Sequence, residues 1–227
     1  AAWPGAVEER HGDVADGTAV AGAVSGVDLV FHLAGLLHVT RPTPDLAREF
    51  ERVNVEGARV VAEEAARAGV SRLVLFSTIA VYGATGPEGA DEDTPPRPDS
   101  PYAETKLRGE EAVGRLDGTG GLRTSVLRLA AVYGPRVTGN YARLAGAIRS
   151  GWFLPVGEGL NRRTLVHEAD VAEAALLAAR SPRAGGRLYN VSDGDTPRLR
   201  DVLEAMCRAL GRPYPRRHVP AGLARAV

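Results

Sequence analysis

The hydrophobic positions along the chain predict short buried strands that alternate with longer amphipathic helices. Residues 27–34, 73–78 and 124–130 are largely apolar runs, as expected for strands that are covered on both faces. Helical spacing of apolar residues follows the first two runs, over 43–68 and 100–115. Because strands that alternate with helices are typical of a parallel sheet, we predict a doubly wound α/β fold for this part of the chain.

Local signals mark where the two long helices begin and end. Thr43 followed by Pro44 is a typical N-cap with proline at the first helical position, and Ser100 followed by Pro101 repeats the pattern. Gly69 is suited to terminate the first of these helices. The sequence therefore predicts one continuous helix from about residue 43 to 68 and a second that starts at Ser100-Pro101.

The pattern changes after Pro135, where the predicted elements become shorter. We expect helices over 140–150, 169–180 and 199–210 and a strand over 187–191. The prediction is a partial dinucleotide-binding domain over 1–136 and a mainly substrate-binding lobe over 137–227, with the helix at 169–180 packing back on the sheet.

Composition and charge narrow the class of protein. The 227 residues are 44% hydrophobic, and their formal net charge is +0. Such a chain has no strong electrostatic attraction to nucleic acid or to an anionic membrane. No apolar run reaches the roughly 18 residues of a membrane span, and no signal peptide is visible. A single cysteine, Cys207, excludes an internal disulfide and fits a cytoplasmic location.

The strongest chemical signal is a tyrosine and a lysine four residues apart, Tyr102 and Lys106, which share one face of a helix. An ammonium near a phenol favours the phenolate, which predicts a lowered pKa for Tyr102 and a general acid/base at working pH. The competing interpretation of the spacing is a solvated helix face. Thr78 ends a buried strand, where ligands of open α/β sheets bind, and its hydroxyl is suited to hold a carbonyl or alkoxide oxygen.

Several motifs in this order resemble the extended short-chain dehydrogenases, the NAD-dependent epimerase/dehydratase family that includes sugar-nucleotide 4-epimerases and 4-keto reductases. The motifs are Gly12-Asp13, residues 30–35, Asn54-Val55, residues 77–83, residues 102–106, residues 127–135 and residues 163–172. The resemblance implies a Rossmann-type sheet that binds NAD or NADP. It also implies that Tyr102 is the catalytic acid/base, that Thr78 hydrogen-bonds the reacting oxygen, and that Lys106 binds the nicotinamide ribose and tunes Tyr102.

The same resemblance assigns a cofactor-binding surface. Asp13 is expected to contact the adenine, and Leu33, Ala34 and Gly35 are expected to line the dinucleotide. Asn54 is grouped with these residues and is expected to support the active-site helix rather than touch the substrate.

For the substrate, the resemblance implies a nucleotide-linked or lipid-diphosphate-linked sugar that undergoes C4 epimerisation or 4-keto reduction. Asn140 and Arg163 are expected to face its diphosphate, because a guanidinium fork matches phosphate geometry. Many sugar-nucleotide members carry asparagine where this chain has Ala131, which leaves an NAD(P)H-dependent reductase of a non-sugar carbonyl as an alternative. A non-catalytic dinucleotide sensor is a second alternative, although such proteins commonly lose the tyrosine or the lysine.

The residues and the family resemblance also give expectations about metal binding and oligomeric state. No second histidine has ligand spacing to His167, so we expect no metal site and interpret His167 as structural. Relatives often dimerise through the two long helices, which implies a homodimer here.

We also expect the chain to lack the first βαβ portion of its sheet, with roughly 45 to 60 residues missing, because no GxxGxxG stretch precedes Asp13. This expectation gives a first prediction. Calorimetric titration of the purified chain with NAD(H) and NADP(H) should show no micromolar binding, since the pyrophosphate-binding loop is absent. Micromolar affinity for either dinucleotide would contradict it.

Overall fold

A computed structural model describes residues 7–37, 43–86, 88–220 and 222, and the chain forms two compact units. Unit 1 consists of Ala1–Leu129 and Glu173–Val191, and unit 2 consists of Ala130–Ala172 and Ser192–Val227. The chain therefore leaves unit 1 after the third strand of its sheet and returns to it before the last strand.

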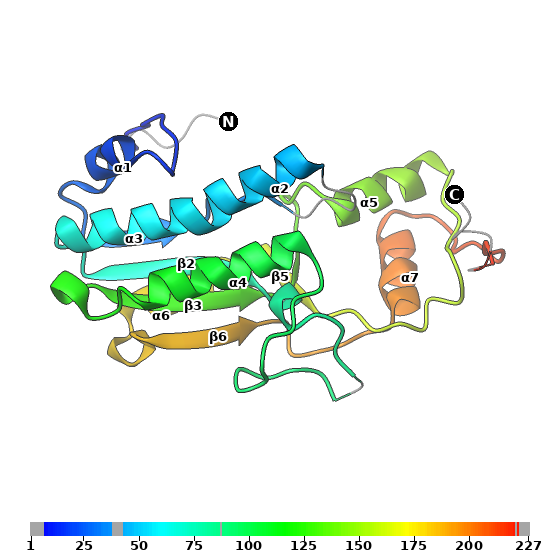
Figure 1. Cartoon of the computed structure of the whole chain (residues 1–227). Coiled ribbons are helices and arrows are strands. Elements are labelled where there is room, and N and C mark those ends of the chain that lie inside the picture. The colour runs from blue at the N-terminus through cyan, green and yellow to red at the C-terminus, as the bar shows by residue number, and fades with distance from the viewer. Residues whose placement is uncertain (1–6, 38–42, 87, 221, 223–227) are drawn as a thin grey trace. The chain divides into compact units, whose positions relative to one another are not determined.

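Unit 1 is built on a four-stranded parallel sheet (Figure 1). Its strands, in spatial order, are β1 (Leu29–His32), β2 (Arg72–Thr78), β3 (Arg123–Leu129) and β6 (Arg187–Val191). Leu75 of β2 is paired with His32 on one side and with Val126 on the other. The predicted parallel sheet is confirmed, and β6 has the bounds that the sequence indicated.

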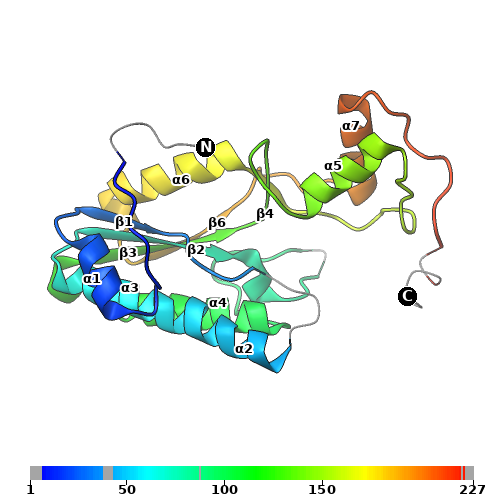
Figure 2. The same cartoon turned by 90° about the horizontal axis from the view of Figure 1, so that it is seen from above.

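Helices cover both faces of this sheet (Figure 2). One face carries α1 (Gly17–Val24), α3 (Gly57–Arg67) and α4 (Pro101–Gly114). The opposite face carries α6 (Glu168–Arg180), whose residues Ala175, Ala178 and Ala179 pack on Val74 and Leu127. This arrangement confirms the doubly wound fold.

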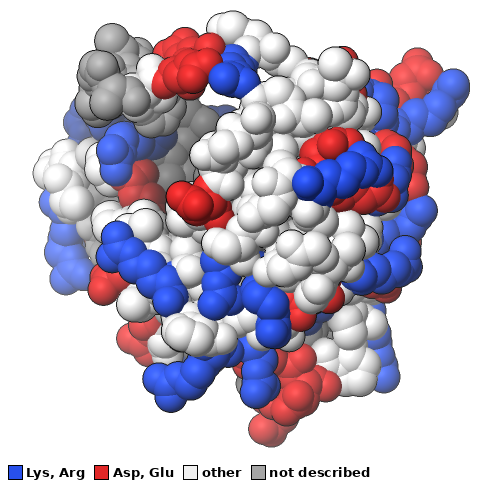
Figure 3. All heavy atoms as spheres, turned by 90° about the vertical axis from the view of Figure 1, so that its left-hand side faces the viewer, with Lys and Arg blue, Asp and Glu red and all other residues white. Residues whose placement is uncertain are grey.

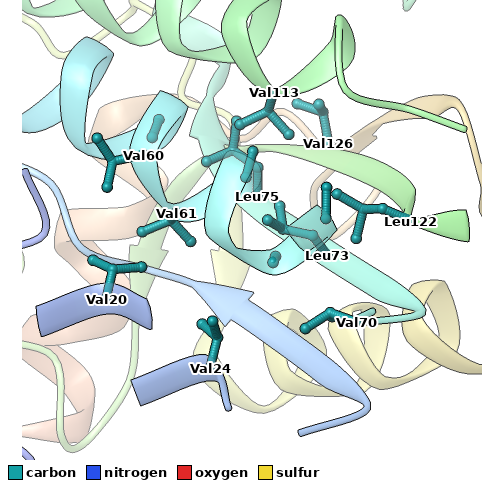
Figure 4. Close-up of a cluster of buried hydrophobic side chains, with 14 residues drawn as sticks. Val20, Val24, Val60, Val61, Val70, Leu73, Leu75, Val113, Leu122 and Val126 are labelled. Atoms are coloured by element: carbon teal, nitrogen blue, oxygen red, sulfur yellow. The ribbon is translucent and has the colours of Figure 1, made fainter. Parts of the chain in front are cut away.

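The larger hydrophobic core lies between the sheet and α1, α3 and α4. It includes Val20, Val24, Val60, Val61, Val70, Leu73, Leu75, Val113, Leu122 and Val126 (Figure 4). Their side chains converge from helix and strand because successive strand residues point to opposite faces of the sheet, and apolar residues recur every three or four positions along each helix.

The first long helical region departs from a continuous α-helix. It consists of α2 (Pro44–Phe50), a π-helical segment η1 (Glu51–Glu56) and then α3. The N-cap prediction is confirmed, because the hydroxyl of Thr43 accepts a hydrogen bond from the Leu46 amide at 3.2 Å. A π-turn inserts an extra residue into the helical repeat, and here it contains the buried side chain of Asn54.

The second long helix, α4, has an unusual buried face. It begins as predicted, with the hydroxyl of Ser100 accepting from the Ala103 amide at 3.3 Å. Alongside Ala103 and Val113, however, this face buries Thr105, Lys106 and Glu110. Charged side chains are almost never fully buried unless they are paired, so these polar groups mark the region where the fold departs from simple core packing.

Short helical turns complete unit 1. They are η2 (Ile79–Tyr82) after β2, η3 (Thr119–Gly121) before β3 and η4 (Pro182–Ala184) before β6.

Among its described residues, unit 2 contains two short parallel strands, the helices α5 and α7 and the first residues of α6. Strand β4 (Ala131–Tyr133) pairs with β5 (Leu165–His167), and α5 (Asn140–Ser150) contacts α7 (Leu199–Ala209). Helix α5 has the predicted bounds, whereas α1, β4 and β5 were not anticipated from the sequence.

The surface carries charges of both signs side by side, as Figure 3 shows for one face. Among the ion pairs of the structure, Arg59 of α3 bridges Glu56 of η1 and Glu63 of α3. Exposed pairs of this kind contribute little to stability. Within the described ranges, no helix is both long enough and apolar enough to cross a membrane.

A core substitution tests this architecture. Leu73 is fully buried in the larger core, so Leu73→Ala should lower the free energy of unfolding by about 2–5 kcal/mol in urea denaturation. The control is Leu177→Ala on α6, whose side chain is 61% exposed and whose loss should cost under about 0.5 kcal/mol. Equal effects of the two substitutions would contradict the assigned core.

Candidate active site

The candidate catalytic residues come together in unit 1, where the end of β2 meets the first turns of α4. Thr78 is the last residue of β2, and its hydroxyl accepts a hydrogen bond from the Ala80 amide at 3.1 Å, which fixes its rotamer. Because α4 begins at Pro101, Tyr102 lies at the start of the helix and Lys106 lies one turn later. The side chains of Thr78 and Tyr102 are hydrogen-bonded to each other.

Tyr102 is partly buried, and its ring packs edge-on against Phe50 with centroids 6.3 Å apart. Burial raises the pKa of Tyr102, and the hydrogen bond with Thr78 offsets only part of that rise. The prediction that Lys106 lowers the pKa of Tyr102 is therefore wrong, because this pKa is raised. The reason is that exclusion of water from the phenolate outweighs the effect of neighbouring groups.

Lys106 is the only lysine in the sequence, and it is buried. Its ammonium donates a hydrogen bond to the carbonyl oxygen of Phe76 at 2.7 Å. Burial lowers the pKa of Lys106 to about 8, against the opposing effect of the Glu110 carboxylate. Lys106 is therefore largely protonated at neutral pH but lies close to its titration range.

His32, the last residue of β1, lies near this lysine. Burial, together with the positive charge of Lys106, lowers the pKa of His32 to about 4. The imidazole is consequently neutral at physiological pH, and it adds no second positive charge beside Lys106.

Asn54 links the loop after β1 to helix α4. Its side-chain oxygen accepts a hydrogen bond from the Leu36 amide at 2.8 Å, and its amide nitrogen donates to the Thr105 hydroxyl at 3.2 Å. Thr105 directly precedes Lys106, so Asn54 contacts the helix that carries Tyr102 and Lys106, and its expected supporting role stays a prediction. The π-segment η1 turns the Asn54 side chain inward to reach both partners.

The predicted cofactor-lining residues form an exposed surface at the carboxyl end of β1. Leu33 is 63% exposed, and Ala34 and Gly35 are also exposed. A Cβ atom at Gly35 would lie 3.2 Å from the side-chain oxygen of Asn54 and 3.7 Å from the Lys106 nitrogen. Glycine therefore keeps the backbone close to Lys106 without crowding it.

Asp13 lies on the surface before α1. Its carboxylate accepts from the Ala15 amide at 2.9 Å and pairs with Arg52 of η1. These two contacts lower the pKa of Asp13. Asp13 is thus ionised and attached to the same π-segment that carries Asn54.

The two predicted diphosphate-binding residues lie in unit 2. Asn140 is the first residue of α5, and Arg163 lies near enough to Tyr141 to affect its pKa, opposing the rise that burial causes. Tyr141 lines a mostly apolar cavity of about 560 Å³ within this unit. Other residues that line it include Tyr133, Val137, Leu165, Val202 and Met206.

Sequence reasoning missed a buried ion pair beside the site. Glu110 accepts three hydrogen bonds from Arg128 of β3, at 3.1, 3.1 and 2.7 Å, and a further one from the Ser77 hydroxyl. The available signal was spacing, because Glu110 follows Lys106 by four residues on the helix, as Lys106 follows Tyr102. In the described part of the chain, no cluster of three or more histidine, cysteine or acidic side chains is placed to hold a metal.

Comparison with known proteins places this site in a family context. A model described as the NAD dependent epimerase/dehydratase family matches residues 4–192. A dTDP-glucose 4,6-dehydratase from Streptomyces niveus is 34% identical over 92% of this chain and 63% of its own length. A 4-hydroxy-2-methyl-3-oxo-4-farnesyl-3,4-dihydroquinoline-1-oxide ketoreductase from Stigmatella aurantiaca is 33% identical over 90% of this chain and 60% of its own length.

A solved structure is similar over most of the chain. The UDP-glucose 4-epimerase of Thermus thermophilus, in complex with NAD, superposes with a TM-score of 0.83 at 30% sequence identity. The match covers 96% of this chain and 74% of that one. The chain spans less than two thirds of the length of both curated relatives described above.

Two glycines of α4 provide a matched test of how the site is held. A Cβ atom at Gly109 would overlap the backbone oxygen of Asn54, whereas one at Gly114 meets nothing within 4 Å. Gly109→Ala should therefore lower the free energy of unfolding by about 1–3 kcal/mol, because η1 is pushed away from α4. Gly114→Ala should raise it by up to about 1 kcal/mol through better helix propensity. Urea denaturation that shows stabilisation by both would refute this close approach.

Proposed function

The chain belongs to the NAD-dependent epimerase/dehydratase family, and we propose that its residues catalyse hydride transfer at C4 of a nucleotide-linked or lipid-diphosphate-linked sugar. The reaction would be that of a 4-epimerase or a 4-keto reductase. The observation that carries the proposal is the meeting of Thr78, Tyr102 and Lys106 at the carboxyl end of β2. Ligands of open α/β sheets bind at this edge, and the three groups supply a hydroxyl, a proton carrier and a cation.

The residues at the carboxyl end of β1 fit a nicotinamide dinucleotide. Ala34 and Gly35 carry no bulky side chain that would keep a dinucleotide away from the backbone. The Asn54 and Lys106 side chains lie so close to Gly35 that a larger residue there would crowd them. An ammonium has three donors, of which Phe76 receives one, so Lys106 has donors left for ribose hydroxyls. When bound there, NAD(P) supplies the acceptor or donor of hydride.

Tyr102 and Thr78 would handle the proton and the oxygen of the reacting carbon. For ketone reduction, Tyr102 donates its phenolic proton to the oxygen that gains negative charge, while the Thr78 hydroxyl hydrogen-bonds the same oxygen. For alcohol oxidation, Tyr102 takes that proton back. The raised pKa keeps Tyr102 protonated at neutral pH, and this is the state that reduction requires.

Tyr102 and Thr78 suffice for oxidation and reduction at one carbon, which is the chemistry of an epimerase or a reductase. We therefore keep to these two reactions in the proposal, although the Streptomyces niveus relative is named as a dehydratase.

A second candidate is an NAD(P)H-dependent reductase of a non-sugar carbonyl. Two observations favour it: the mostly apolar lining of the unit 2 cavity, and the absence of an amide side chain at Ala131. The ketoreductase relative, whose named substrate carries a farnesyl group, is in line with this alternative.

In a full-length protein that includes the pyrophosphate-binding segment expected upstream, Tyr102→Phe should lower kcat by about 10²- to 10⁴-fold, since the proton carrier is lost while the ring remains. The assay follows C4 epimerisation of UDP- and dTDP-hexoses, and NADH consumption with their 4-keto forms and with a 3-oxoalkanoate. Circular dichroism checks that the variant is folded, and Tyr189→Phe on β6 is the control. Unchanged turnover in Tyr102→Phe would refute the assigned role, and turnover of the 3-oxoalkanoate alone would support the second candidate.

A further inference from the structure

Helix α4 contacts the end of β2 through three residues at four-residue spacing. Tyr102 hydrogen-bonds the side chain of Thr78, Lys106 hydrogen-bonds the carbonyl of Phe76, and Glu110 accepts from the hydroxyl of Ser77. Three consecutive strand residues, 76 to 78, are thus each held by one residue of the same helix face. Glu110 supplies the third of these contacts and has no part in the proton transfer described above.

The carboxylate of Glu110 is itself firmly oriented. The side chains of Glu110 and Arg128 are each 5% exposed, and three hydrogen bonds join them. Arg128 in turn lies 4.8 Å above the ring of Tyr82, whose hydroxyl donates to Asn190 at 2.9 Å. Because every member of this buried network has a partner, the carboxylate is held in one orientation.

The charges that surround Lys106 give Glu110 a second effect. In the described part of the chain, Glu110 supplies the negative charge that acts on Lys106. The other titratable groups around this pair are His32 of β1 and Tyr102 of α4, which are both neutral at pH 7, and Arg128 of β3, which is positive and pairs with Glu110. Burial disfavours the ammonium, so the attraction of Glu110 opposes the loss of its proton.

We propose that Glu110 is a positioning residue of this site: its carboxylate, one helical turn beyond Lys106 on the same face of α4, holds the Ser77–Thr78 end of β2 and places a fixed negative charge beside the lysine. The inference rests on the proposed function for its catalytic meaning, because a charged Lys106 matters to hydride transfer only if Tyr102 and a dinucleotide react there. The effect of the Glu110 charge on the protonation of Lys106 can be measured without any enzymatic turnover.

The sequence makes that measurement direct. Since Lys106 is the only lysine, protein grown with ¹³Cε-lysine gives a single lysine resonance, whose shift with pH reports the protonation of this ammonium. Glu110→Gln should lower the titration midpoint of Lys106 by about 1–3 pH units, because the opposite charge is lost and Arg128 is left unbalanced. Glu110→Asp should restore most of the midpoint, since it keeps the carboxylate.

Glu111→Gln is the matched control. Glu111 is the next residue of α4, but its side chain is 53% exposed and pairs with Arg115 at 3.7 Å. The Lys106 midpoint should be unchanged in this variant. A Glu110→Gln midpoint equal to that of the wild type would overturn the proposal.

Loss of one partner from a buried ion pair can prevent folding, so a second variant is needed. Glu110→Gln combined with Arg128→Met removes both charges and leaves none unpaired. Its Lys106 midpoint should still be below that of the wild type, because the carboxylate that favours the ammonium is gone. A wild-type midpoint in the double variant would likewise overturn the proposal.

Activity measurements separate the effect of Glu110 on Lys106 from the proposed catalytic function. If Lys106 must be charged for turnover, the high-pH limb of the kcat profile should shift in Glu110→Gln by the same number of pH units as the resonance. A shifted resonance in a full-length protein that turns over neither sugars nor other carbonyls would support the action of Glu110 and refute the proposed function. A shifted resonance with an unmoved kcat profile in an active protein would overturn the positioning role.

Discussion

The organisation of unit 1 depends on the burial of polar side chains between helix α4 and the end of strand β2. A lysine and a glutamate removed from water are costly unless each finds a partner. Here the ammonium of Lys106 has the Phe76 carbonyl, and the carboxylate of Glu110 has Arg128 and Ser77. An apolar face on α4 would pack more simply, but it would place no ammonium beside Tyr102 and Thr78.

The segments around α4 are shaped to preserve this contact. The π-segment η1 carries Asn54 inward to bind both the loop after β1 and the helix residue beside Lys106. Gly109 allows α4 to approach the backbone of that segment, and Gly35 allows the loop to approach Lys106. These departures from regular helix and loop geometry gather around one small region, as is common where a fold gives up local regularity for a functional site.

Desolvation governs the chemistry of this region more than any single charge does. It raises the pKa of Tyr102 and lowers those of Lys106 and His32, so each group is moved toward its neutral form. The result is a protonated phenol, a neutral imidazole and an ammonium near its titration range. Neighbouring groups then adjust the balance, Thr78 for the tyrosine and Glu110 for the lysine.

The sequence by itself determined the class of fold, the order of its main elements and the family. Buried strands such as residues 73–78 are recognisable by their continuous apolar character, and Thr43 and Ser100 mark helix starts through local hydrogen bonds. The spacing of Tyr102 and Lys106 also placed both on one helix face. All these features depend on neighbours within a few residues, so a single sequence reveals them.

Only the tertiary structure decided features that depend on distant residues. The short elements α1, β4 and β5 have too few residues for a periodic pattern, and the π-turn at Asn54 follows from contacts with Leu36 and Thr105. The pairing of Glu110 with Arg128 joins a helix to a strand 18 residues away. The direction of the Tyr102 pKa was mispredicted because local spacing reports nearby charge, whereas exclusion of water is set by the whole of the surrounding packing.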